Sequence, residues 1–178
     1  TTRTVSGSTS STSPTTVLAV AKNATYKTGK DLNGKTIGVS TLRDLQQASV
    51  MKWVDGNGGD SSTLKFIEVP VPEMAPGLVA GRLDASCLLE PSLTYAKNDI
   101  RVLGKCYDAI AKTLTITTHM ARQDWLDKNA AAAHAFISAM RNTAHWVNAN
   151  PKEAAPILAN ITKIPVATID RMARVVFA

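Results

Sequence analysis

One stretch of this chain, residues 31–91, constrains its fold more than any other. Three short apolar segments in it are typical of buried strands, namely 36–40, 64–69 and 84–89. Two segments with helical spacing of apolar residues lie between them, 44–54 and 74–80. Two strand–helix–strand units in succession predict a parallel sheet, and such a sheet presents ligand sites at the carboxyl ends of its strands.

The rest of the chain divides into two kinds of segment. Residues 1–16 are dominated by Ser and Thr and are typical of a flexible tail or an extended connection. Further strands are predicted at 17–21, 100–103 and 114–118. A short helix is predicted after Pro91, and longer ones around 136–147, 151–161 and 165–177. The chain is therefore predicted to be α/β to about residue 119 and helical after it.

Composition argues against two classes of partner. The net charge is +6, which favours anionic ligands in general. No two Lys or Arg residues are adjacent, and only nine residues are aromatic, so neither a basic run nor a base-stacking surface for nucleic acid is indicated. No apolar run approaches the length that crosses a bilayer, so no membrane span is predicted.

Two cysteines, Cys87 and Cys106, are the only ones in the chain. They are too far apart in sequence for a C-x-x-C motif, which argues against zinc and thioredoxin-like chemistry. Cys87 lies in a strand pattern and is expected to pack as a small apolar residue. A disulfide between the two is compatible with an oxidising compartment, and the sequence leaves their pairing open.

Ser40, Thr41, Leu42 and Arg43 follow a predicted strand and precede a predicted helix. Free N–H groups at a helix start favour an anion, typically by about 0.3–1 kcal/mol at exposed sites. The hydroxyl groups can donate as well, and Arg43 can bind a carboxylate or sulfonate with two hydrogen bonds. Ordinary capping of the helix by Ser or Thr is the alternative interpretation.

Glu90 ends the third predicted strand, at the same edge as Ser40. It can bind an amine or hydroxyl of a ligand, act as a latch, or simply cap the next helix. The three histidines are scattered, without the spacing of a metal site: His119, His134 and His145. No nucleophile, phosphate-loop, zinc-protease or dinucleotide motif is present, so we expect no enzyme activity, no metal and no cofactor.

Residues 31–39 resemble the D-L-x-G-K-x-[IV]-[GA]-V segment of the solute-binding proteins of ABC transporters, in particular the nitrate/sulfonate/taurine class with its aliphatic-sulfonate-binding members. Four further pieces match that class in order: Ser-Thr-Leu at 40–42, a proline-bracketed loop at 68–74, the A-L-x-x-G-x-[VL]-D-A…E-P signature at 78–91, and W-x-x-x-N-P-x-E-A-A at 146–155. Their order and spacing make the set specific.

This resemblance implies a type II periplasmic-binding-protein fold, in which two α/β lobes close on a ligand about a two-segment hinge. Members of the class have about ninety further residues at the N-terminus, a large part of a lobe. The chain is therefore expected to be a fragment, essentially lobe 2 plus the helical return to an incomplete lobe 1. The expected divisions are a hinge-proximal connection at 1–14, lobe 2 at 15–112, a second hinge strand at 113–119 and the helical part of lobe 1 at 120–178. The hinge itself is expected at 5–7 and 114–118.

Carried across the matching positions, the resemblance implies ligand contacts from Ser40, Thr41, Leu42 and Arg43, then from Glu90 and from Pro72 at the rim. The implied function is extracytoplasmic or periplasmic capture of a small anionic organic solute, such as a sulfonate, a carboxylate or a nitrate-like anion, for a membrane permease. Two alternatives remain open. One is the effector-binding domain of a LysR-type regulator. The other is a thiamine-pyrimidine-synthase-like protein, which shares the D-L-x-G-K segment but needs a pocket histidine and a cysteine-rich motif.

Overall fold

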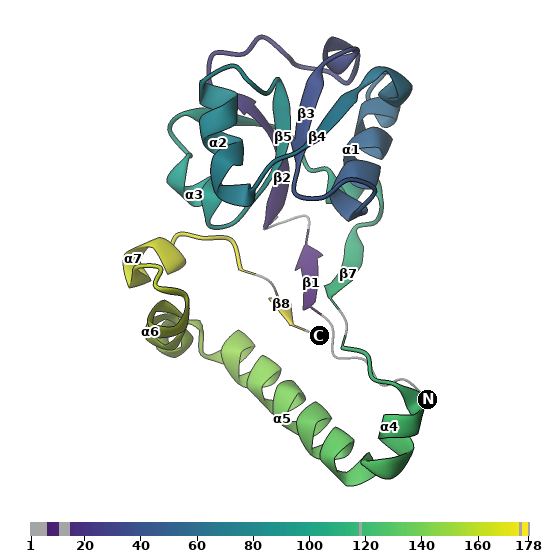
Figure 1. Cartoon of the computed structure of the whole chain (residues 1–178). Coiled ribbons are helices and arrows are strands. Elements are labelled where there is room, and N and C mark those ends of the chain that lie inside the picture. The colour runs from purple at the N-terminus through teal and green to yellow at the C-terminus, as the bar shows by residue number, and fades with distance from the viewer. Residues whose placement is uncertain (1–6, 11–14, 118, 175, 178) are drawn as a thin grey trace.

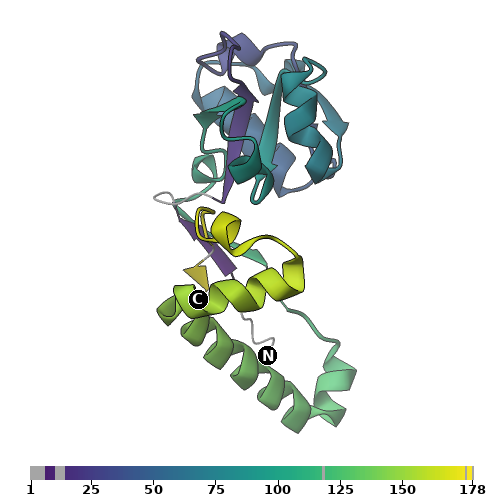
Figure 2. The same ribbon diagram turned by 90° about the vertical axis from the view of Figure 1, so that its left-hand side faces the viewer.

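Three short strands connect an α/β lobe to a set of helices in the computed structural model of this chain (Figure 1). The structure describes residues 7–10, 15–117, 119–174 and 176–177. Figure 2, turned by 90°, shows the connecting strands between the lobe and the helices. The fold class is therefore α/β, as predicted.

The lobe is built on a five-stranded sheet of order β4-β3-β5-β2-β6. Its strands are β2 (Thr16–Ala21), β3 (Thr36–Val39), β4 (Lys65–Glu68), β5 (Ala85–Leu89) and β6 (Ile100–Gly104). β3 pairs in parallel with β4 and β5, and the helices α1 (Leu45–Gly56) and α2 (Val71–Val79) form the crossovers. The two predicted strand–helix–strand units are confirmed, but β2 runs antiparallel to both β5 and β6, so the sheet is mixed.

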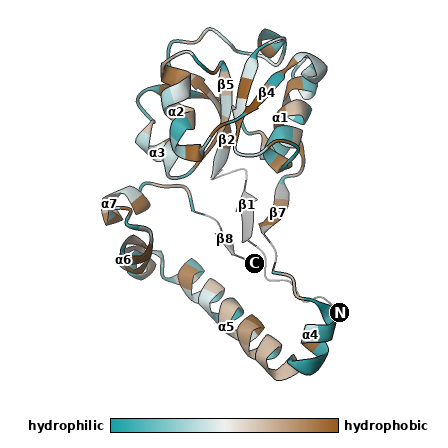
Figure 3. Ribbon diagram, in the orientation of Figure 1, coloured by the Kyte–Doolittle hydropathy of each residue, from teal (hydrophilic) through white to brown (hydrophobic). Residues whose placement is uncertain are grey.

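Side chains of the sheet are buried on both faces, and β2 shows why. Leu18 and Val20 point into the cluster under α1, whereas Val17 and Ala19 point into the cluster under α2. These four side chains are at most 2% exposed. Fully burying an aliphatic side chain of this size contributes about 1.5–3 kcal/mol, so a strand apolar at every position specifies a place in the middle of the sheet. Figure 3 shows hydrophobic residues concentrated in this sheet.

Gly38 allows the second layer to pack closely on β3. A Cβ there would lie 2.8 Å from Leu83 Cδ1 and 3.1 Å from Ser86 Oγ. The hydroxyl of Ser86 donates to the Gly38 carbonyl at 2.9 Å. A side chain larger than glycine would push these neighbours away, which explains the glycine in the Ile-Gly-Val segment of the strand.

Asp84, just before β5, joins the amino-terminal ends of β3 and β5. Its carboxylate accepts the Thr36 N–H at 2.9 Å and the Tyr26 hydroxyl at 2.6 Å. Lys35 lies 4.0 Å from the same carboxylate and 5.4 Å from the centre of the Tyr26 ring. The hydrogen bond to Asp84, followed by burial, raises the pKa of Tyr26 above its ordinary value. The Leu-Asp-Ala piece of the sequence is thus a structural clamp at the edge opposite the expected site.

Short helical turns complete the lobe: η1 (Lys30–Leu32), η2 (Ser61–Thr63), α3 (Ser92–Tyr95) and η3 (Tyr107–Ala109). The three connecting strands, β1 (Gly7–Ser10), β7 (Thr113–Thr117) and β8 (Val176–Phe177), form a second sheet of order β7-β1-β8. β1 is antiparallel to both of its neighbours. The expected hinge segments overlap β1 at Gly7 and β7 at 114–117, whereas residues 5, 6 and 118 lie outside the described residues.

The prediction of a helix over 165–177 is wrong. The helix α7 spans only Val166–Ile169, and the chain then crosses to β8. The guanidinium of Arg174 donates to the Pro151 carbonyl at 2.5 Å and to Asp170 at 3.1 Å. Val176 and Phe177 are residue types that favour strands, and they pair with β1. Because β1 lies far away in the sequence, the local spacing of apolar residues gives no sign of this pairing.

The other helices of this part are α4 (Gln123–Lys128), α5 (Ala130–Ala149) and α6 (Pro151–Thr162). α5 carries the predicted amphipathic pattern, with Met140 and Val147 half-buried and Phe136 50% exposed. Ile161 on α6 is 71% exposed. Within the described residues, no helix has the length and apolar character that a membrane crossing requires.

Replacing Asp84 by Ala is expected to lower the free energy of unfolding by about 2–3 kcal/mol, because two hydrogen bonds are lost and each contributes about 1–1.5 kcal/mol at this partly exposed carboxylate. Tyr26→Phe removes one donor and should cost about 1 kcal/mol. Urea unfolding followed by circular dichroism measures both.

The exposed Asp99 provides the control, since Asp99→Ala should stay within about 0.5 kcal/mol of the parent. A clamp role for Asp84 is contradicted if Asp84→Ala and Asp99→Ala unfold at the same urea concentration.

Candidate functional site

The carboxyl ends of β4, β3 and β5 form one edge of the lobe. Glu68 is the last residue of β4, Ser40 follows β3, and Glu90 follows β5. Because β3 lies between β4 and β5, the loop at 40–43 has a carboxylate on each side. Thr16 of β2 pairs with Leu89 of β5, so this edge is also the one from which β2 leads back to the connecting sheet. The predicted site residues therefore lie where the lobe meets the connecting strands.

Side-chain oxygens accept from three N–H groups in and around the loop. Gln46 Oε1 accepts from Ser40 N at 2.8 Å and from Ser40 Oγ at 3.0 Å. Glu68 Oε1 accepts from Leu42 N at 2.8 Å, and Gln47 Oε1 accepts from Arg43 N at 2.7 Å. Each of the three N–H groups is held by a different side-chain oxygen, and an oxyanion would bind them by replacing these oxygens.

The residue that caps α1 is Asp44, whose carboxylate accepts from Gln47 N at 3.1 Å. The alternative in which Ser40 or Thr41 is the ordinary cap is therefore wrong, and these two residues precede the cap. The spacing Asp44-x-x-Gln47 is that of a capping box, a signal that is visible in the sequence. The Gln47 side chain reaches one residue further back than usual, to Arg43 N.

Arg43 has left-handed backbone geometry, with φ of 62°. This conformation is uncommon for residues other than Gly, Asn and Asp, and such residues cluster at ligand sites. Its side chain is exposed, and no described residue forms an ion pair with it. The guanidinium is therefore free to bind an anion with two parallel hydrogen bonds. Thr41 and Leu42 are exposed as well.

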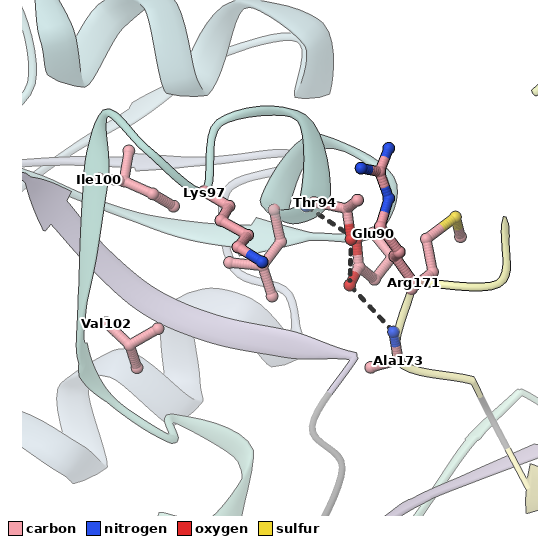
Figure 4. Close-up of a pocket in the computed structure, with 9 residues that line it drawn as sticks. Glu90, Thr94, Lys97, Ile100, Val102, Arg171 and Ala173 are labelled. Carbon is pink, nitrogen blue, oxygen red and sulfur yellow. Dashed lines mark hydrogen bonds between the residues drawn. The ribbon is translucent and has the colours of Figure 1, made fainter. Parts of the chain in front are cut away.

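Glu90 makes different contacts. Its carboxylate accepts from Thr94 N and Thr94 Oγ1, both at 3.0 Å, and from Ala173 N at 3.1 Å (Figure 4). It thus caps the short helix α3 and also ties the segment that leads to β8 onto the lobe. Two of the roles considered for this residue, a cap and a latch, are combined in one side chain.

A pocket of about 410 Å³ opens beside Glu90 (Figure 4). Its walls carry two cationic side chains, Lys97 and Arg171, and apolar groups from Leu93, Ile100, Val102 and Met172. None of Ser40 to Arg43 lines it. The structure therefore places Glu90 in a pocket between α3, β6 and residues 171–173, and not among the groups of the loop. Pro72 lies exposed in the first turn of α2.

Sequence reasoning did not identify Gln46, Gln47 and Glu68 as parts of this site. Gln47 carries the capping-box signal described above and Gln46 precedes it, which gives their place on the first turn but not their reach into the loop. Glu68 comes from a neighbouring strand, 26 residues from Leu42, so no local pattern connects them. Among the described residues, no group of three His, Cys, Asp or Glu side chains gathers as a metal site would.

Several solved structures that resemble this chain are named as periplasmic binding proteins. The periplasmic aliphatic sulphonate binding protein SsuA of Escherichia coli superposes with a TM-score of 0.75 at 17% identity, over 98% of this chain and 58% of that one. The alkanesulfonate-binding protein SsuA of Xanthomonas axonopodis pv. citri, bound to MOPS, gives 0.73 at 13% identity, over 98% and 62%. The periplasmic nitrate-binding protein NrtA of Synechocystis PCC 6803 gives 0.69 at 16% identity, over 94% and 46%.

These likenesses establish the periplasmic-binding-protein fold, and this chain spans only about half to three fifths of the length of those proteins. No curated protein sequence matches it. The model of the NMT1/THI5-like family matches residues 5–154, which is most of the chain. By that match, the chain is a member of the NMT1/THI5-like family.

Proposed function

We propose that this chain is part of the solute-binding component of an ABC importer, which captures a small organic oxyanion between two lobes outside the cytoplasm. The observation that carries the proposal is the loop at 40–43 at one edge of the lobe, where the Arg43 guanidinium has no ion-pair partner among the described residues. Three N–H groups of the same loop are each held by a side-chain oxygen that an oxygen of the solute can replace. Sulfonates, carboxylates and nitrate present oxygens in the geometry that such a guanidinium binds.

The fold supports capture by closure. Proteins of this fold that are named for binding sulfonates or nitrate align with 94–98% of the chain. The connecting sheet β7-β1-β8 is the natural axis for a rigid movement of the lobe against the helical part. A solute that contacts both sides shifts the population to the closed form, and only its differential affinity for that form supplies the energy. The closed form would then be the one that a membrane permease recognises.

The placement of the histidines favours binding over catalysis. His119, His134 and His145 all lie beyond β7, outside the lobe that carries the loop. The ring of His119 packs edge-on against Phe136, 5.4 Å between centres. A thiamine-pyrimidine-synthase-like reaction would need a pocket histidine, which this lobe does not supply. The overall charge of +6 also suits an anionic solute better than a cationic one.

Arg43→Ala is expected to weaken oxyanion binding about 10- to 100-fold, because it removes a charge-assisted contact worth about 1.5–3 kcal/mol. Isothermal titration with ethanesulfonate, nitrate and acetate, on protein that contains both lobes, measures this. Arg82→Ala is the matched control, since Arg82 is exposed and precedes β5 at the opposite edge of the sheet. The proposed contact is wrong if the two variants bind an anion equally well, and the proposed function fails if the parent protein binds no oxyanion at all.

Glu68 competes with the solute in this arrangement, because its carboxylate already accepts from Leu42 N. Glu68→Gln should tighten oxyanion binding about fivefold at low ionic strength, since two charges about 4 Å apart in water interact by about 1 kcal/mol. The gain should shrink in about 1 M salt, where the screening length falls to about 3 Å.

Glu153→Gln, an identical change at an exposed position on α6, should leave the affinity unchanged. Weaker binding of every anion by Glu68→Gln would show instead that Glu68 holds a cationic or hydroxyl group of the solute.

A further inference from the structure

The two cysteines come together in the core of the lobe. Cys87 lies on β5, and Cys106 lies between β6 and η3. Their Sγ atoms are 3.1 Å apart, joined by a hydrogen bond that either thiol can donate. Both side chains are 0% exposed. The sequence left the pairing of these cysteines open, and the structure brings the two thiols into direct contact.

Strand register explains the encounter. β2 lies between β5 and β6, and Leu18 of β2 pairs with Cys87 on one side and with Gly104 on the other. Cys106 follows Gly104 by two residues, just beyond the end of β6. Both thiols belong to the buried cluster under α1, together with Leu18 and Tyr107. Pairing on both sides of β2 thus brings the two cysteine-bearing segments close together, and packing in this cluster places the thiols in contact.

We propose that Cys87 and Cys106 form an intramolecular disulfide in the exported protein. The proposal rests on the proposed function only for the oxidising location, because the pairing itself rests on the geometry. Disulfides form and persist in the periplasm and other extracytoplasmic spaces, where two neighbouring thiols can be oxidised by exchange with another disulfide.

The exchange balances with a dithiol–disulfide oxidant, either a protein disulfide or a small-molecule disulfide. Either cysteine can react first as its thiolate, for example Cys106. The Cys106 thiolate attacks one oxidant sulfur, the oxidant S–S bond breaks, and the other oxidant sulfur leaves as a thiolate. Cys87 then loses its proton and attacks Cys106 Sγ, which releases the second oxidant thiolate. Two thiols are oxidised, and the oxidant takes up two electrons and two protons. Because both sulfurs are buried in the folded lobe, the exchange takes place before β5 and the segment at 104–106 have closed together.

The bond would act on the pocket beside Glu90. It closes a loop over residues 87–106, which contains α3, β6 and every lobe residue that lines the pocket. The latch residue Glu90 lies in the same loop, and Cys106 immediately precedes η3, from which the chain passes to the connecting strand β7. A cross-link between the two ends of this loop stabilises the fold mainly by reducing the conformational entropy of the unfolded chain. It also joins the wall of the pocket covalently to the central sheet.

The test begins with denatured protein refolded in a buffer of oxidised and reduced glutathione, then denatured again and alkylated without reductant. Mass spectrometry should show an unalkylated monomer lighter than the reduced chain by two hydrogen atoms, with a cross-linked peptide containing Cys87 and Cys106. The melting temperature of the oxidised form should exceed that of the reduced form by about 10 °C or more. The double variant Cys87→Ala/Cys106→Ala should melt at one temperature with and without reductant.

Two alkylated cysteines in the refolded monomer, or a disulfide-linked dimer, would overturn the pairing. A bond that forms on refolding but is absent from protein alkylated directly in its cells of origin would overturn the disulfide in the exported protein. Oxyanion titration of the reduced and oxidised forms is read separately, so that a failure of the proposed function is distinguishable from a failure of the cross-link.

Discussion

The position of β2 is the constraint on which the rest of this structure depends. It is buried at its first five residues and pairs antiparallel with β5 on one side and β6 on the other. Antiparallel pairing with β5 brings the start of β2 to the carboxyl edge of the sheet, so the connecting strands and the loop at 40–43 meet there. The same pairing on both sides brings the segments that carry Cys87 and Cys106 together, and their Sγ atoms lie 3.1 Å apart. Removing β2 would therefore separate the site edge from the connecting strands as well as divide the core.

Local patterns predicted most of the lobe because its strands are apolar and its turns are marked by Gly, Pro and Asp. Residues 36–40, 64–69 and 84–89 each became a strand within two residues of the predicted ends. The reversed direction of β2 carries no such mark, because the apolar pattern of a strand is the same in both directions. The helix predicted over 165–177 failed for the related reason that β8 is stabilised by β1, more than 160 residues earlier in the chain.

The sequence predicted where the site lies but not which side chains hold its loop. The sequence indicated Ser40 to Arg43 because a strand and a helix meet there, and the structure adds the acceptors that hold the loop. Gln46 and Glu68 act through side-chain reach, which depends on rotamers and on the neighbouring strand. Glu90 was expected at the same edge and lies there, but its three hydrogen bonds direct it toward α3 and Ala173. Local spacing cannot distinguish these two directions for one carboxylate.

The order of the connecting sheet limits how the two parts can move. β1 is the middle strand and shares backbone hydrogen bonds with both β7 and β8, so sliding one strand past another would break main-chain pairs. Bending or twisting the three strands together keeps those pairs. The register of β1 against β7 shifts between Gly7 and Ser8, and such an irregularity increases the local twist of a strand pair. The lobe is therefore expected to move against the helical part by bending or twisting of the three strands together, and not by sliding along them.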